Sequence, residues 1–146
     1  MPRTEHAITI GRPVGDVFAV LGDVENTARW HPSAIEERWT SEGPIGIGST
    51  RHSVGKAYGL RSENDAEVVL FEPPSALGLR SLVSPVPFEI TILLRPEENG
   101  TAITWISELR PTGLLRLVVG ATRPLHDRQT RRGLERRKAL MESGML

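Results

Sequence analysis

The feature that most restricts the fold of this chain is a long helical stretch at its end, predicted over Leu114–Glu142. Seven short runs with strand character precede it. Its first and last turns carry apolar side chains, but the segment between them, residues 126–133, is polar. A helix buried on all sides would be apolar there as well. The pattern therefore predicts a helix that lies across a sheet and encloses a chamber whose wall is partly polar.

The strands are predicted from alternating apolar and polar residues between turn signals. A first strand covers His6–Ile10, and two short helices, Arg12–Leu21 and Val24–Trp30, follow it. The six later strands are predicted at Ile35–Thr40, Ser49–Val54, Glu63–Phe71, Ala76–Val83, Phe88–Leu94 and Thr101–Leu109. Their short connections favour antiparallel neighbours, with Asn99-Gly100 as the strongest hairpin signal. Pro124 is expected to bend or break the last helix.

Size and composition limit the class of protein. A chain of 146 residues is long enough for one domain, 1–146, with a core of its own. The absence of cysteine excludes disulfides and thiolate zinc sites. The four histidines share no metal-ligand spacing, and Gly43, Gly46 and Gly48 precede a strand where a nucleotide loop would enter a helix. We therefore predict no metal and no cofactor. Without a signal-like or membrane-spanning run, the expected protein is cytoplasmic and not inserted in a membrane.

Charge is unevenly distributed along the chain. Residues 110–146 hold nine Arg and Lys against three acids, a net charge of +6, so the remainder carries −6 because the whole chain is neutral. Such a basic helix can attract nucleic acid or a membrane surface, or its arginines can be an ordinary helix surface paired with nearby acids. No aromatic residues interleave with the arginines for base stacking, so we favour the second interpretation and predict no nucleic-acid partner. A docked partner protein and a homodimer stay open.

Four short motifs occur in a particular order: Trp30-His31-Pro32, Gly46-Ile47-Gly48-Ser49-Thr50-Arg51, Phe71-Glu72-Pro73-Pro74 and Asn99-Gly100-Thr101. With the element order βααββββββα, they resemble the START-like (SRPBCC) superfamily, and within it the polyketide cyclase/dehydrase and lipid-transport group. The resemblance covers nearly the whole chain. It implies an α+β helix-grip fold, in which a curved antiparallel seven-stranded sheet wraps around the long last helix and leaves an internal cavity. It implies little about chemistry, because this fold serves many functions and no shared catalytic set can be transferred.

Arg51 and His52 are adjacent on a predicted strand, so their side chains point to opposite faces. The resemblance places an arginine at Arg51, which favours Arg51 as the inward residue. There it could bind a carboxylate or an enolate. An internal ion pair with Glu63 or Asp65 on the neighbouring strand is at least as well supported. If Arg51 faces outward, His52 takes the inner position.

Other candidate ligand contacts come from the expected wall of the chamber. Trp30 is interpreted first as a core anchor. For His31, a titrating residue at the chamber mouth and a structural residue hydrogen-bonded to the backbone are equally well supported. Alternation assigns two groups of side chains to the interior: Phe88, Ile90, Ile92 and Leu94 on one strand, and Ile103, Trp105, Ser107 and Leu109 on the next. One face of the last helix would place Leu125, Gln129 and Arg132 over the chamber, provided that this face does not rotate after Pro124.

Two functions from different classes fit these residues. The first is binding, as a carrier or by sequestration, of a small hydrophobic or aromatic molecule, driven by burial of about 25 cal/mol per Å² before association costs. The second is a polyketide cyclase or dehydratase, with His31 and Arg51 as the best candidates for proton transfer and enolate charge. No acid–base pair is evident from spacing, and this favours binding.

Overall fold

The computed structural model describes residues 3–22, 34–57, 60–84, 86–110 and 115–143, with some side chains of the last helix left out. In chain order the elements are β1 (Arg3–Ile10), α1 (Val14–Gly22), β2 (Ala34–Trp39), β3 (Thr50–Ala57), β4 (Leu60–Glu72), β5 (Ala76–Val83), β6 (Phe88–Glu97), β7 (Gly100–Leu109) and α3 (Leu115–Glu142). The seven predicted strands and the long last helix are confirmed. The predicted helix Val24–Trp30 lies outside the described residues.

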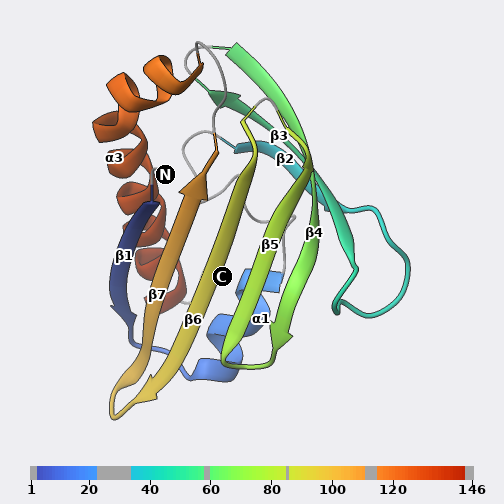
Figure 1. The fold of residues 1–146 in the computed structure, drawn as a ribbon. Coiled ribbons are helices and arrows are strands. Elements are labelled where there is room, and N and C mark those ends of the chain that lie inside the picture. The colour runs from blue at the N-terminus through green and yellow to red at the C-terminus, as the bar shows by residue number, and fades with distance from the viewer. Residues whose placement is uncertain (1–2, 23–33, 58–59, 85, 111–114, 144–146) are drawn as a thin grey trace.

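All seven strands form one antiparallel sheet in the order β1-β7-β6-β5-β4-β3-β2. From β2 to β7 each strand pairs with its neighbour in sequence, as short connections favour. The chain instead passes from β1, at one edge, to β2, at the other. Figure 1 shows the sheet curling around one side, with α1 and α3 on that side. This arrangement confirms the predicted helix-grip fold.

Several strands are longer than the sequence pattern predicted. β1 begins at Arg3 rather than His6, and β6 continues to Glu97 although Pro96 lies within it. The exposed ends of these strands carry mainly polar residues, so their hydropathy does not alternate. Periodicity therefore misses them even where their backbone forms hydrogen bonds with the neighbouring strand. Only β5, at Ala76–Val83, has the predicted bounds.

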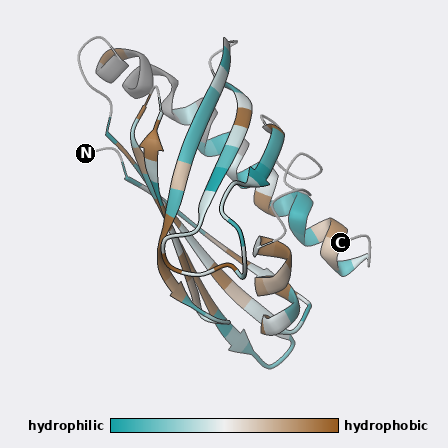
Figure 2. Cartoon of the chain, turned by 90° about the vertical axis from the view of Figure 1, so that its right-hand side faces the viewer, coloured by the Kyte–Doolittle hydropathy of each residue, from teal (hydrophilic) through white to brown (hydrophobic). Residues whose placement is uncertain are grey.

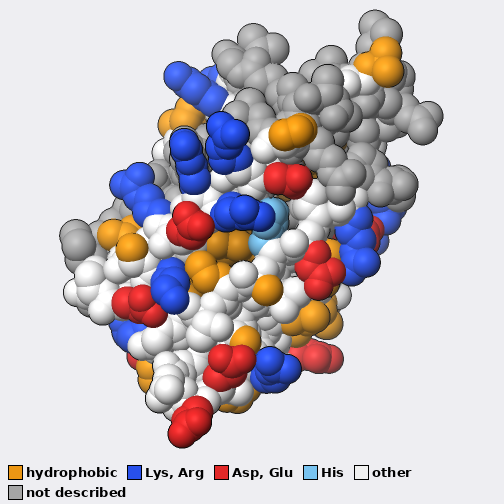
Figure 3. All heavy atoms as spheres, turned by 90° about the vertical axis from the view of Figure 1, so that its left-hand side faces the viewer, with side chains coloured by type: hydrophobic (Ala, Val, Ile, Leu, Met, Phe, Trp, Pro, Cys, Tyr) orange, Lys and Arg blue, Asp and Glu red, His pale blue; other side chains and the backbone are white. Residues whose placement is uncertain are grey.

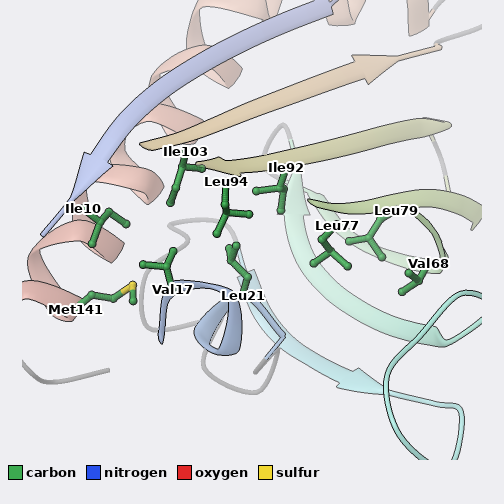
Figure 4. Packing of buried hydrophobic residues seen from close by; sticks show 10 residues of the cluster. All are labelled: Ile10, Val17, Leu21, Val68, Leu77, Leu79, Ile92, Leu94, Ile103 and Met141. Atoms are coloured by element: carbon green, nitrogen blue, oxygen red, sulfur yellow. The ribbon is translucent and has the colours of Figure 1, made fainter. Parts of the chain in front are cut away.

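Apolar side chains fill the inner face of the sheet, which faces α1 and α3. Figure 4 shows ten buried residues of this core meeting from five strands and both helices. They are Ile10, Val17, Leu21, Val68, Leu77, Leu79, Ile92, Leu94, Ile103 and Met141. In Figure 2 the hydrophobic colour gathers on the strands beside α1, whereas much of the described part of α3 is hydrophilic. The core therefore lies mainly between α1 and the sheet.

α3 is one helix that continues through Pro124, and its first turns point in a different direction from the rest (Figure 1). Thus the helix bends rather than breaks. Its buried residues recur at helical spacing: Thr130, Gly133, Leu134, Arg137 and Met141. Arg132, which the sequence placed over the chamber, is exposed, so that prediction is wrong. The apolar face used for it was extrapolated across the bend. Among the described residues, no helix is long and apolar enough to cross a membrane.

Three hydrogen bonds attach the C-terminal end of α3 to the end of β1 and the turn after it. Lys138 Nζ donates to the carbonyl of Thr9 over 2.7 Å, and Arg12 Nη1 donates to the carbonyl of Met141 over 2.8 Å. The backbone NH of Gly11 donates to a Glu142 carboxylate oxygen over 2.7 Å. Charge-assisted bonds of this kind are stronger than neutral ones, so this end of the helix is held firmly on the sheet edge.

The β6–β7 hairpin confirms the Asn99-Gly100 turn signal, although Gly100 itself already pairs with Glu97.

Gly100 has φ 153°, and a Cβ there would lie 2.1 Å from the carbonyl oxygen of Ile10. We expect Gly100→Ala to lower the free energy of unfolding by about 3 kcal/mol, because the β1 end must move to admit a methyl group. Chemical denaturation measures this. Gly15→Ala, where no atom lies within 4 Å of the added carbon, is the control and should not destabilise; equal stability of the two variants would contradict the argument.

Candidate ligand-binding site

Strand register traces the inner face from one edge of the sheet to the other, because directly opposed residues of antiparallel strands lie on the same face. One row runs His6–Trp105–Ile92–Leu77–Phe71 from β1 to β4. At the far edge Trp39 of β2 is opposite Arg51 of β3. The inner face thus carries aromatic, aliphatic and ionisable side chains together.

A pocket with a volume of about 250 Å³ opens between α1 and the sheet. Phe18, Ala19 and Gly22 of α1 form one wall, and β2, β4, β5 and the β2–β3 loop supply the others, through Trp39, Phe71, Leu77 and Ile45. The lining is almost wholly apolar. Its one polar group of note, the Trp39 indole NH, donates to the Gly22 carbonyl over 3.0 Å and so joins the strand edge to the helix end.

An ion pair lies next to this pocket. Arg51 Nη1 is 3.3 Å from a Glu37 carboxylate oxygen, and both side chains are largely buried, with 13% and 10% of their surface exposed. The Nε atom of Arg51 is buried and makes no hydrogen bond with any of the described residues. The predicted inward orientation of Arg51 is therefore confirmed, but the predicted partners, Glu63 and Asp65 on β4, are wrong. The partner lies on β2, the other neighbouring strand, and sequence order does not reveal which side of a strand supplies the acid.

Arg137 reaches the same region from α3. Its side chain is 2% exposed, and its guanidinium carbon lies 5.8 Å from the centre of the Trp105 ring, within cation–π range. Burial lowers the pKa of Arg137 to about 9, with Glu37 raising it and Arg51 lowering it further. The group is still cationic at neutral pH. Two guanidinium groups and a carboxylate thus share the interior beneath the C-terminal half of α3.

His6 and Asp127 form a second polar contact under α3. His6 shares the inner face with Trp105, and its Nε2 lies 3.9 Å from an Asp127 carboxylate oxygen. Both atoms are buried, and within the described part of the chain neither makes a hydrogen bond. The same holds for the hydroxyl of Thr4, two residues before His6 on β1. Sequence reasoning missed His6 as an interior residue because it was treated only as the start of a strand.

His52 lies on the outer face of the sheet, so its prediction as a ligand contact is wrong. Its Nδ1 is 2.6 Å from an Asp65 carboxylate oxygen, and its Nε2 is 3.5 Å from one of Glu63. The hydrogen bond to Asp65 raises the pKa of His52 above its ordinary value. The two acids expected to pair with Arg51 therefore pair with its neighbour on the opposite face.

The remaining predicted contacts divide into two groups. Phe88, Ile90, Ile92, Ile103, Trp105 and Ser107 all lie on the inner face, with Ile92 and Ile103 inside the core cluster. None of them lines the described pocket, so ligand contact by them stays a prediction. Trp30 and His31, and the side chains of Leu125 and Gln129, lie outside the described residues.

The pocket residues Phe18, Trp39, Ile45 and Phe71 were not predicted as site residues. Each belongs to a different element, and they meet only because the chain crosses from one edge of the sheet to the other through α1. The only sequence signal was apolar periodicity, which cannot separate a pocket wall from a filled core. Within the described residues, no group of three or more His, Asp or Glu could hold a metal ion.

Comparison of the chain with known protein families gives a match. The model of the family described as "polyketide cyclase / dehydrase and lipid transport" matches residues 1–142. The chain belongs to this family. Membership supports a role in ligand binding or cyclisation without deciding between them. No curated protein matches the chain.

Solved structures of similar fold support the same architecture. The Deinococcus radiodurans protein DR_A0006 has 20% identity and a TM-score of 0.74, covering 99% of each chain. TTHA0849 from Thermus thermophilus has 18% identity and a TM-score of 0.73, covering 92% of this chain and 90% of that one. The Zhui aromatase/cyclase from a Streptomyces species has 17% identity and a TM-score of 0.74, covering 99% and 96%. At these identities the likeness establishes the helix-grip fold alone.

The Glu37–Arg51 pair should contribute to folding because each charge has lost much of its hydration. We expect Glu37→Gln to lower the free energy of unfolding by about 3 kcal/mol, since it leaves a buried guanidinium facing a neutral amide. Replacing both partners, Glu37→Leu with Arg51→Met, should recover most of that loss. Denaturant titration measures each value. Glu63→Gln is the control, because that exposed carboxylate should matter by less than about 1 kcal/mol; equal losses at Glu37 and Glu63 would refute the buried pair's role.

Proposed function

We propose that this protein binds a small apolar or aromatic molecule in the pocket between α1 and the sheet, as a carrier or by sequestration. The observation that carries the proposal is the apolar lining of a partly open pocket in a packed domain. An exposed hollow between aromatic side chains is hydrated at a free-energy cost, and an apolar ligand removes that cost.

The volume indicates the size of the ligand. A dry cavity of about 150 Å³ can hold benzene, and pockets for drug-sized ligands are about 300–1,000 Å³. At about 250 Å³ the pocket suits a body of one or two rings, or a short chain. Burial of about 200 Å² of aromatic surface at about 25 cal/mol per Å² gives about 5 kcal/mol before association costs. Before those costs, about 5 kcal/mol corresponds to a Kd of about 0.2 mM, so the expected affinity is weaker, in the range of about 1 mM or above.

Arg51 supports an anionic or enolisable group on the ligand. Arg51 lies directly opposite Trp39, which lines the pocket. The Cβ atoms of two such opposed strand residues are about 5 Å apart. Its buried Nε has no hydrogen-bond partner among the residues that the structure describes, and its Nη1 already contacts Glu37. A carboxylate that passes Trp39 would receive a charge-assisted hydrogen bond from Nε. The proposed ligand is therefore a small aromatic acid or enol.

Filling the mouth of the pocket tests this proposal. Ala19→Phe places a ring on the exposed α1 wall and should weaken binding of 2-naphthoate at least tenfold, because ligand and ring would occupy the same space. Ligand-observed NMR at millimolar probe concentration detects such weak binding. Leu93→Phe adds a similar ring to an exposed position that does not line the pocket, and should leave binding unchanged. Equal binding by both variants, or none by the wild type, would end the proposal.

A second function, a cyclase or dehydratase, is favoured by one observation: Arg51 presents its guanidinium to the inner face beside the pocket. A fixed cation there would stabilise the enolate that forms during an intramolecular aldol closure. His31, the predicted proton-transfer residue, lies outside the described residues.

Turnover separates the two functions. If the protein is a cyclase, it should convert an aromatic poly-β-keto substrate to a cyclised product, detected by mass spectrometry and ultraviolet absorbance. Arg51→Lys, which keeps the charge but not the planar fork, should lower kcat by about tenfold or more while the fold survives. Binding of the substrate without any conversion would leave carrier activity as the function.

A further inference from the structure

The outward side of α3 carries four exposed arginines, Arg128, Arg131, Arg132 and Arg136, which we call the basic face of α3. The buried stripe with Leu134, Arg137 and Met141 lies on the other side of the helix. Glu135 is the one acid among them in sequence. From Arg128 to Arg136 the face is about 12 Å long at about 1.5 Å per residue. This places four cations on roughly two turns of helix surface.

The sequence favoured pairing of these arginines with nearby acids, and the structure contradicts it. None of the four hydrogen-bonds or ion-pairs with another residue in the part of the chain that the structure describes. Exposed arginines on the outer face of the sheet behave differently. Arg38 lies 3.8 Å from Glu36, Arg61 lies 3.9 Å from Glu63, and Arg95 lies 3.3 Å from Glu97. The positive charge of the basic face is therefore presented to solvent, whereas that of Arg38, Arg61 and Arg95 on the sheet is locally offset.

Figure 3 views the side of the molecule on which α3 and β1 lie, and Lys and Arg side chains gather at its upper left. At the N-terminal end of the same helix, the side chain of Leu117 is 73% exposed. A cationic face on a helix that also exposes an apolar residue fits an anionic lipid interface. Nucleic acid fits less well, because residues 126–138 contain no Phe, Tyr or Trp on which bases could stack.

From these observations we propose that the basic face of α3 docks the protein on a membrane surface that contains anionic lipids. The arginines lie near the phosphate and carboxylate groups of the lipids. α3 is suited to this because its C-terminal end is fixed to β1 through Lys138 and Arg12. These two side chains bond to backbone carbonyls within the protein and hold the helix in place, so the four arginines can contact lipid headgroups. The proposal does not depend on the ligand of the pocket.

Vesicle co-sedimentation tests the docking. Each basic residue near an anionic surface contributes about 1 kcal/mol, so removing three should weaken binding roughly 100-fold. The variant Arg131→Gln, Arg132→Gln, Arg136→Gln should lose that factor on phosphatidylcholine vesicles with about 30% phosphatidylserine. Glutamine has nearly the helix propensity of arginine, so α3 should stay folded, and circular dichroism confirms this. Wild-type binding should be absent on pure phosphatidylcholine and should fall steeply at about 0.5 M salt.

The matched control changes the net charge equally on the outer face of the sheet, with Arg38→Gln, Arg61→Gln and Arg95→Gln. This variant should bind the anionic vesicles within about threefold of wild type, because its arginines are already offset by acids. Three results would each overturn the proposal: equal losses in the two triple variants, equal binding to charged and uncharged vesicles, or binding to a DNA duplex with none to vesicles. Binding of 2-naphthoate by the helix variant shows separately whether the pocket is intact.

Discussion

A seven-stranded antiparallel sheet has two faces, and this structure depends on burying the inner one against α1 and α3. The sheet curls toward the helices, so that side chains from β1 and from β2, at opposite edges, approach the same interior. α1 fills one end of the concave side with Val17 and Leu21, and Met141 of α3 joins them. Because α1 and α3 do not cover the whole of the curled sheet, an apolar hollow is left between α1 and the strands, and this hollow is the pocket.

The interior is apolar beside α1 and ionisable beneath α3. This division has an energetic cost, since Arg51, Glu37 and Arg137 all lose hydration on folding. Well-packed apolar residues would hold the same elements together at least as well, so stability alone does not account for three ionisable groups there. They fit the proposed function, in which these groups would recognise a polar or anionic part of the ligand while the apolar pocket takes its body. Trp39 lines the pocket and lies opposite Arg51.

Much of the fold could be predicted from local pattern. Ala76–Val83 is bounded by turn signals on both sides and forms β5 with those bounds, and Asn99-Gly100 marks the last hairpin. The residues of the candidate site were harder to predict from the sequence than the strands were. Arg51 could be placed on the inner face with the help of a family resemblance, but its partner Glu37 could not, because pairing with β2 rather than β4 depends on sheet geometry. His6 and Arg137 were also missed. Both are polar residues whose burial follows from the packing of α3 against β1 and β7, not from their neighbours in sequence.

The sequence by itself determined the number of strands, their antiparallel pairing, the long final helix and its excess of positive charge. These follow from backbone periodicity, turn residues and composition, which act over a few neighbouring positions. Only the tertiary structure decided which face of the C-terminal half of α3 is buried, because the polar residues 126–133 leave no apolar stripe there that would mark it. It also decided that Phe18, Trp39 and Phe71 enclose a pocket, since the distance between side chains from separate elements depends on how the whole sheet curls.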